Sequence, residues 1–358
     1  MKPNTLPELT TDDYKTSYFE FWPAWLFYFP MKVYGIYLAI KFRSLTVPTL
    51  ANPSFDAGGF AGESKSQILD LVPKNTQKYF ARHKTMRTPV THKDALNFVA
   101  DHNFSYPFVM KPDIGYKGYG IQIINNEQNL TDYIDAFPPR EQIVVQDLYD
   151  YPYEVGVFYI RHPDQEKGQV FSLTLKYFPH VTGDGVSTLE QLIEQNPRMN
   201  ELKHKYVARH KGKLKSVLKK GDVFRVAFTG SHTWGTLFKD GNHLITPAMT
   251  NLFDEISKSV PEFYFGRYDV RFKDIAHLET GEDIKIVEIN GATAEATHIW
   301  DSKTTLLTAY KTLMQQYHHM FEIGYKNKQR GMTPMPLKEI LRRIRRGDDL
   351  IKTYPVTH

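Results

Sequence analysis

The chain of 358 residues contains no cysteine. This absence excludes disulfides, zinc sites built on thiolates, iron–sulfur clusters and cysteine nucleophiles. A strong charge of one sign is also absent, because 45 Lys and Arg residues stand against 40 Asp and Glu residues. The net charge of +5 permits anionic partners but is too small to indicate nucleic-acid binding. We therefore expect no nucleic-acid partner.

Neither a repeat of fixed period nor a secretory signal is visible in the sequence. The polar start, residues 1–16, has no apolar core followed by a small-residue cleavage site. Apolar residues make up 41% and charged residues 24%, which is ordinary for globular domains. The length predicts about two or three structural units. We expect a cytoplasmic protein, with attachment to the inner membrane surface as an alternative.

Aromatic residues, at 14%, are crowded into residues 18–42. Within this segment, residues 21–40 contain a single charge, Lys32, and are close to the length of a membrane span. Lys32 would lie near the bilayer centre, and Pro23 and Pro30 would interrupt a spanning helix. Trp and Tyr also favour interfaces over hydrocarbon. Two interpretations are favoured: a helix on a membrane surface or a partner, and a segment packed on the protein's own core. A true membrane span is the third and least favoured interpretation.

Strand and helix patterns alternate through the rest of the chain. An apolar period of two, bounded by turn residues, predicts strands in YPFVMKP, GIQII, QIVVQDLY and EVGVFYI, and again in YFGRYDVRF and IKIVEIN. Residues 188–220 and 247–260 are predicted to be helical, and the tail PLKEILRRIRRGDDLIK a basic helix. Asp240-Gly241 fits a hairpin turn between strands. The pattern predicts an α/β (α+β) fold.

A glycine-rich loop follows one of these strands. Lys111 ends an apolar strand, and residues 113–120 contain Gly115, Gly118 and Gly120 before the next strand begins. Glycines let the backbone approach phosphate oxygens and direct N–H groups at them, and a lysine adds a positive charge for the same anion. The sequence therefore indicates a phosphate-binding loop, with an ordinary glycine hairpin as the alternative.

Acidic and amide side chains mark two later strands. Residues two apart on a strand face the same side, so Arg267, Asp269 and Arg271 share one face, and Glu288 and Asn290 share another. If the strands are neighbours, Asp269, Glu288 and Asn290 form a cluster of hard oxygen donors suited to magnesium. A salt-bridge cluster with the two arginines is the alternative. Burying two carboxylates without a cation is costly, which favours the metal.

In this order, and with Gln146-Asp-Leu148 and Glu154 between them, these motifs resemble the ATP-grasp superfamily. The resemblance runs from about Lys74 to about His298, and the most similar patterns are those of D-alanine:D-alanine ligase and the ligase portion of cyanophycin synthetase. It implies two sheet-containing lobes that clasp ATP, with one or two Mg²⁺ ions, or Mn²⁺, as cofactors. The N-terminal βαβ unit of such ligases is hard to find in residues 1–74.

The resemblance also implies roles for particular residues. Arg267, and with it Arg271, would be catalytic, and the metal ligands would be Asp269, Glu288 and Asn290. The implied ATP contacts are Lys74 or Lys78, Lys111, Gly115, Lys117, Gly118, Gly120, Gln146, Leu148, Glu154 and Lys176.

Substrate contacts are the least defined part of the site. A loop of residues 177–188, with His180 and Thr182, resembles the corresponding loop of cyanophycin synthetase and suits a mobile cover. The same residues are also typical of the start of a helix, with Ser187 or Thr188 as the N-cap and Gln191 as the capping-box partner. His232 would lie in an acceptor pocket. Residues 59–66 nearly match a phosphate loop but lack its second glycine and fit better as a carboxylate-binding segment.

We therefore expect an aromatic substrate-side unit (1–73), an ATP-grasp domain (74–315, its lobes divided at about residue 160) and a basic helical tail (316–358). The expected reaction joins a small-molecule carboxylate to an amine through an acyl phosphate, with ADP and phosphate as products. The alternatives are a kinase that phosphorylates a small molecule and a membrane-associated nucleotide-binding scaffold. Peripheral membrane contact through residues 18–42 and a homodimer are both compatible with the sequence.

Overall fold

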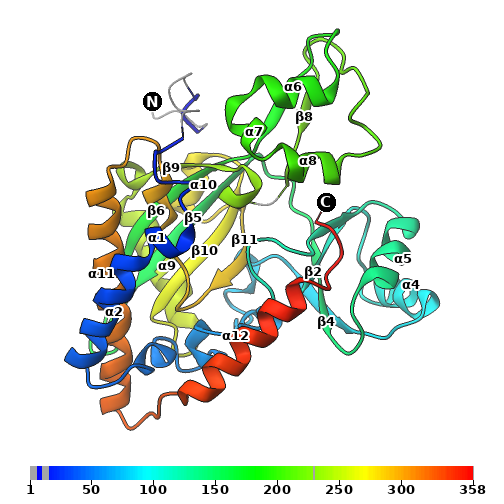
Figure 1. Cartoon of the computed structure of the whole chain (residues 1–358). Coiled ribbons are helices and arrows are strands. Elements are labelled where there is room, and N and C mark those ends of the chain that lie inside the picture. Colours follow the sequence, from blue (N-terminus) through cyan, green and yellow to red (C-terminus); the bar gives the residue numbers. More distant parts are fainter. Residues whose placement is uncertain (1–5, 10–15, 229, 358) are drawn as a thin grey trace.

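The computed structural model describes residues 6–9, 16–228 and 230–357. Within them, the chain is a mixed α/β molecule built around two antiparallel sheets, with a third, smaller lobe at one end (Figure 1). The predicted fold class is confirmed.

The first sheet carries the glycine-loop motif and has the strand order β1-β4-β2-β3. Its antiparallel strands are β1 (His83–Arg87), β2 (Phe108–Pro112), β3 (Gln122–Ile124) and β4 (Gln142–Asp147). Helices α4 (His92–Asp101) and α5 (Glu127–Ala136) lie on its outer side (Figure 1). Thr91 and Asn126 cap these helices by accepting a backbone N–H three residues on. The three strands predicted here from the sequence are confirmed.

The second sheet has the order β11-β10-β5-β6-β9 and is covered on both faces. Side chains alternate along β5, so that Val155 and Val157 pack toward α9 while Phe158 and Ile160 pack toward α11. Both faces are therefore buried, and this sheet holds most of the hydrophobic core. The elements are β5 (Tyr153–Ile160), β6 (Gln169–Tyr177), β9 (Leu237–Asp240), β10 (Phe265–Phe272), β11 (Ile284–Asn290), α9 (Pro247–Ser259), α10 (Ile275–Thr280) and α11 (Leu306–Gln329).

The third lobe, green in Figure 1, has a small hydrophobic core of its own. Thr188 and Gln191 form the predicted capping box at the start of its first helix. The lobe consists of β7 (His180–Thr182), α6 (Leu189–Gln195), α7 (Pro197–Glu201), α8 (Lys203–Arg209) and β8 (Val223–Arg225).

The described part of residues 1–73 contains helices and turns and no strand. Phe27, Met31 and Leu38 are buried against the body of the molecule, so one face of the aromatic segment does pack on the protein's own core. The elements here are α1 (Ala24–Phe27), α2 (Phe29–Lys41), η2 (Val47–Leu50), η3 (Asp56–Gly59) and α3 (Lys65–Asp70), followed by η4 (Gln77–Tyr79). None of the described helices has both the length and the apolar character needed to cross a bilayer.

The predicted lobe boundaries do not coincide with the divisions between the observed sheets and helices. β5 was expected at the end of the glycine-loop lobe, but it pairs with β6 and β10, so the lobes divide near residue 150 rather than at 160. The expected boundary at 315 falls inside α11, a continuous helix of 24 residues that packs on α2 and η2. The tail helix is α12 (Leu337–Ile351).

The predicted hairpin at Asp240-Gly241 is wrong. β9 ends at Asp240, and the chain continues into a single 3₁₀ turn, η6 (Asn242–Leu244), instead of a return strand. The Asp301 side chain accepts the backbone N–H of Asp240, and the side chain of Asn242 accepts the N–H of Leu173 on β6. These tertiary contacts hold the chain in a path that the local turn signal does not encode.

Candidate active site

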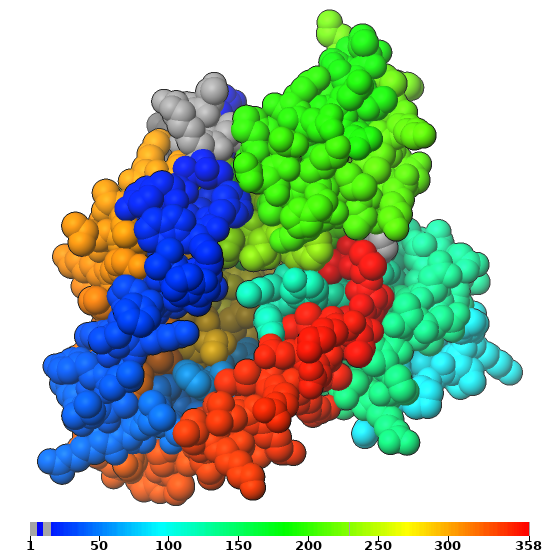
Figure 2. Space-filling view, in the orientation of Figure 1, coloured from blue at the N-terminus to red at the C-terminus, as the bar shows by residue number. Residues whose placement is uncertain are grey.

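The two sheets face each other across a cleft of about 700 Å³. In Figure 2 the cleft is seen as a hollow between the blue N-terminal segment and the red helix α12. The residues that line it include Lys111, Gly115, Lys117, Gly118, Gln146, Leu148, Glu154, His232, Arg267, Asp269, Arg271, Glu288 and Asn290. The structure therefore brings most of the sequence-predicted site residues to one cavity.

Two predicted residues lie just behind the wall of the cleft. Lys176 is buried beneath it and donates to Glu154 (2.8 Å) and to Asp269 (2.9 Å). Gly120 is buried at the base of the glycine loop with a φ of +72°. A Cβ at this position would lie 2.7 Å from Pro112 Cγ, so only glycine fits the turn.

Four other predicted residues do not line the cleft. Lys74 and Lys78 are exposed near η4, and the Lys78 ammonium lies over the ring of Tyr79. His180 and Thr182 are exposed on β7 in the third lobe. The geometry therefore does not favour phosphate contacts by either lysine, or substrate contacts by His180 and Thr182.

The glycine loop is held by partners that are distant in sequence. Trp234 donates its indole N–H to the carbonyl of Lys117 (2.8 Å). The Thr357 hydroxyl donates to the carbonyl of Gly118 (2.9 Å) and accepts the N–H of Gly120 (3.0 Å). The C-terminal segment thus lies across the loop and fixes its backbone.

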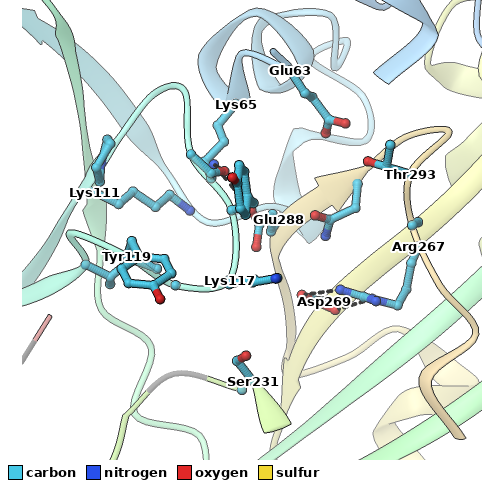
Figure 3. A pocket seen from close by; sticks show the side chains of 18 of the residues that line it. Glu63, Lys65, Lys111, Lys117, Tyr119, Ser231, Arg267, Asp269, Glu288 and Thr293 are labelled. Atoms are coloured by element: carbon cyan, nitrogen blue, oxygen red, sulfur yellow. Dashed lines mark hydrogen bonds and ion pairs between the residues drawn. The ribbon is translucent and has the colours of Figure 1, made fainter. Parts of the chain in front are cut away.

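Lys111 is buried at the end of β2 and points into the cleft (Figure 3). Its ammonium donates to Gln146 Oε1 (2.9 Å) and to the carbonyl of Val287 (3.0 Å). Burial lowers the pKa of Lys111 to about 8, in spite of the opposing effect of Glu288. Lys111 therefore bridges the two sheets and is a cation that an anionic ligand would stabilise.

The conditional prediction that the two acidic strands are neighbours is confirmed. β10 and β11 pair antiparallel, with Asp269 directly opposite Glu288 and Arg267 opposite Asn290. The register shifts between Asp269 and Val270. Such an irregularity re-aims side chains at the point where the carboxylates lie.

A chain of buried ion pairs surrounds Asp269. Arg267 Nε and Lys176 Nζ each lie 2.9 Å from Asp269 Oδ1, and Lys176 continues to Glu154, which in turn meets Arg271 (2.8 Å). Burial acts to raise the pKa of Asp269, but Arg267 and Lys176 outweigh it and lower the pKa to about 2. The carboxylate is therefore ionised at any physiological pH.

The donor set fits a magnesium ion. Asp269, Glu288 and Asn290 offer hard oxygen donors on adjoining strands. The Nδ2 atom of Asn290 is buried without a hydrogen-bond partner among the described residues, so this amide nitrogen is available to donate to a ligand. Figure 3 shows Lys111, Lys117, Glu288 and Asp269 around the same space.

Segment 59–65 supplies two pocket residues to which the sequence analysis gave no role of their own. Lys65 Nζ donates to the carbonyl of Gly115 (2.6 Å) and lies 3.7 Å from Glu288 Oε1. Glu63 accepts the N–H of Gly291 (3.0 Å), and burial raises its pKa to about 8. The segment therefore reaches the cleft, and its binding of the substrate carboxylate stays a prediction.

The aromatic segment also reaches the cleft. Tyr28, between α1 and α2, donates to Glu295 Oε2 (2.7 Å), and Trp300 donates to the other carboxylate oxygen (2.6 Å). His232 stacks on Trp300, and burial lowers the pKa of His232 to about 3. His232 is therefore neutral, which fits an apolar or hydrogen-bonding wall better than an anion contact.

A group of side chains with metal-ligand geometry lies elsewhere among the described residues. His162, His319 and Glu322 bring their ligand atoms within 4.8 Å of one another. Lys326 already donates to His162 (3.2 Å) and pairs with Glu322 (3.2 Å), so a cation occupies the acidic side of this group.

Comparison with known proteins gives distant relatives. No family model matches the chain. It is 25% identical over 251 residues to cyanophycin synthetase of Geminocystis herdmanii, a match that covers 65% of this chain. The chain spans about a quarter of the length of that curated relative, 26%.

Among solved structures, similar chains include ligases that join amino acids. D-alanine–D-alanine ligase of Bacillus anthracis shares 10% identity over 78% of this chain and 72% of its own, with a TM-score of 0.45. The D-Ala:D-Ser ligase VanG of Enterococcus faecalis shares 13% identity over 74% and 64%, with a TM-score of 0.41. These likenesses concern the fold alone. The sequence similarity to cyanophycin synthetase agrees with the resemblance that the motifs predicted.

Proposed function

We propose that this chain is an ATP-dependent carboxylate–amine ligase that works through an acyl phosphate. The observation that carries the proposal is the facing of Asp269 and Glu288 across the β10–β11 pair, in the same cleft as Lys111 and the glycine loop. Phosphoryl transfer needs anion-binding groups and metal ligands in one water-poor cavity, and this cleft offers both.

The glycine-loop side would bind the nucleotide. Lys111 and Lys117 supply positive charge for its phosphates, and the loop N–H groups supply hydrogen-bond donors. Gln146 and Leu148 at the end of β4 suit the adenine edge, and the carboxylate of Glu154 suits the ribose hydroxyls. Glu154 is held in place by Lys176 and Arg271.

The β10–β11 side would hold the reacting groups. Asp269, Glu288 and Asn290 would hold magnesium, which neutralises phosphate charge as it is transferred. The substrate carboxylate attacks the γ-phosphorus, ADP leaves and an acyl phosphate forms. An amine then attacks the acyl carbon and phosphate leaves.

Arg267 is placed to stabilise the oxyanion that develops at the acyl carbon. It is fixed by Asp269 and by the carbonyl of Glu295 (3.0 Å), so its charge is oriented in advance. The amine must lose a proton on attack, and Glu63 in the same pocket has a pKa, raised by burial to about 8, that suits a base. No covalent bond to the enzyme is required.

The experiment measures ADP and phosphate release from MgATP with a panel of carboxylates, each with and without a panel of amines. Hydroxylamine is added to trap an acyl phosphate as a hydroxamate. We expect hydroxamate with at least one carboxylate, and no turnover in Glu288→Ala. ADP release without free phosphate or hydroxamate would replace the ligase proposal with the kinase alternative.

A further inference from the structure

The outer face of α1–α2 carries a continuous stripe of large apolar side chains. Phe29, Val33, Ile36 and Ile40 are all exposed, Ile36 by 60% and Ile40 by 73%. At about 100° per residue they fall within about 60° of the helix circumference. Trp25, 66% exposed, continues the stripe at α1. Single exposed apolar residues are ordinary, but an ordered stripe of this size indicates a docking surface.

The opposite side of the same helix is already buried. Met31 and Leu38 lie about 180° from the stripe and pack into the core of the molecule. The helix therefore has two apolar faces, of which the inner one meets protein and the outer one meets solvent. The chain's own core accounts for one face and leaves the other without an occupant among the described residues.

The charged residues of this segment are all positive. Lys32 and Lys41 lie on its two flanks and Arg43 lies just beyond the helix, and all three are exposed. No acidic residue occurs between residues 21 and 55. An apolar stripe edged by Lys and Arg, with Trp and Tyr among its members, is the composition that lies in the interface of an anionic bilayer.

We propose that the outer face of α1–α2 (Trp25, Phe29, Val33, Ile36, Tyr37 and Ile40) binds the surface of a bilayer that contains anionic lipid. A second copy of this chain fits the surface less well. A two-fold contact would bring the cations of the two copies (Lys32, Lys41 and Arg43) together without an acidic partner from this segment. A span is excluded for α2, whose 13 residues fall short of the about 20 that a bilayer needs.

The position of this surface connects it with the cleft. Tyr28, at the junction of α1 and α2, lines the cleft with its hydroxyl on Glu295. In Figure 2 the same segment forms one rim of the hollow. α12 forms the other rim, where Ile344 lines the cleft and Leu341 is exposed. A bilayer on the outer face of α1–α2 would therefore lie beside the entrance through which substrates pass.

The test is co-sedimentation of the full chain with vesicles of phosphatidylcholine, with and without phosphatidylglycerol. We expect binding that requires phosphatidylglycerol and weakens with salt. Ile36→Glu with Ile40→Glu should weaken binding about tenfold or more, since two buried apolar contacts become charges. Lys32→Glu with Lys41→Glu should remove the dependence on phosphatidylglycerol. These positions are exposed, so thermal unfolding should change little.

A matched control places the same change elsewhere. Val186 and Val223 are exposed apolar residues of the third lobe, and Val186→Glu with Val223→Glu should leave vesicle binding unchanged. Absence of binding by the unmodified chain would overturn the proposal, as would equal binding by the Ile36 and Ile40 variant. Self-association that the same variant abolishes, without vesicle binding, would assign the surface to a second copy instead. None of these outcomes depends on turnover, so the ligase proposal is tested separately.

Discussion

The glycine loop and the strand pair β10–β11 face the same cleft but are held by different forces. The loop is held mainly through its backbone, by the Trp234 indole and the Thr357 hydroxyl, and Lys117 and Tyr119 on it are exposed. On the strand pair, Asp269 is 7% exposed and sits between Arg267 and Lys176.

This difference indicates that the strand pair positions charges in the cleft, whereas the loop is the part that can close over a ligand. Ion pairs inside a sheet fix charges before any ligand arrives, which is what stabilisation of a developing charge requires. The loop is held by separate hydrogen bonds to its backbone, from the Trp234 indole, the Thr357 hydroxyl and the Lys65 ammonium, each contributing about 1–3 kcal/mol. It can therefore open at smaller cost than the strand pair. We expect substitutions on the strands to impair chemistry and folding together, and those on the loop to affect nucleotide binding.

The largest effect should come from Asp269→Asn. It leaves Arg267 and Lys176 without their shared anion, so unfolding free energy should fall by about 3–5 kcal/mol. If Asp269 is a metal ligand, turnover should fall at least about a thousandfold at temperatures where the variant remains folded. Denaturant unfolding and MgATP turnover measure the two effects.

A matched control exists in the same region. Asp254 on α9 is equally buried, pairs with Lys258 (2.8 Å) and accepts from Tyr159 (2.6 Å), but it does not line the cleft. Asp254→Asn should destabilise the protein and leave turnover intact. Similar activity losses in both variants would show that Asp269 acts only through stability.

Lys111→Met should weaken ATP binding about tenfold to a hundredfold, because a buried cation facing the phosphates is lost. Folding should suffer little or improve, since a buried charge is replaced by an apolar chain of similar length. Calorimetric titration with ATP and thermal unfolding give both quantities. An unchanged dissociation constant would remove Lys111 from the phosphate site.

The pH dependence of ATP binding should report the charge on Lys111. Lys111 has a lowered pKa of about 8, so it is charged below pH 8 and becomes neutral above it. Affinity should therefore fall as pH rises from 7.5 to 9.5, by up to about tenfold per unit. Glu63 gains negative charge in the same range, so the measurement is best made in Glu63→Gln, where the decline should persist. In Lys111→Met the decline of ATP affinity with pH should become shallow.

The smallest effect should come from Thr357→Val. This change removes the hydrogen bonds to Gly118 and Gly120 and should cost about 1 kcal/mol of loop stability. Faster amide exchange at residues 118–120 and an ATP affinity reduced less than about tenfold are expected. Thr353→Val is the control, because the Thr353 hydroxyl bonds only within its own turn, to Leu350. Equal exchange in both variants would contradict a role for the C-terminal segment.

Local pattern predicted the strands and the residues they carry. The period of two placed Lys111 at the end of β2, and Asp269 and Glu288 on strands that proved to be neighbours. Apolar alternation and turn residues act over a few positions, so they are visible in one sequence.

What the sequence missed depends on contacts between distant segments. Lys65 meets Glu288, more than 200 positions later, and Thr357 meets Gly118 at a similar separation. No local pattern encodes such pairs. The assignment of β5 to the glycine-loop lobe is wrong for the same reason. The residues of a strand do not determine which strands pair with it.

The C-terminal segment across the glycine loop also bears on how this protein is handled. Tyr354 donates to the carbonyl of Ile114 (2.6 Å), and Thr357 lies three residues further along the same path. An affinity tag or fluorophore attached next to Thr357 would therefore lie beside the glycine loop, which lines the cleft. Such an attachment can serve as a reporter of loop movement, and an untagged chain is the reference for every kinetic measurement.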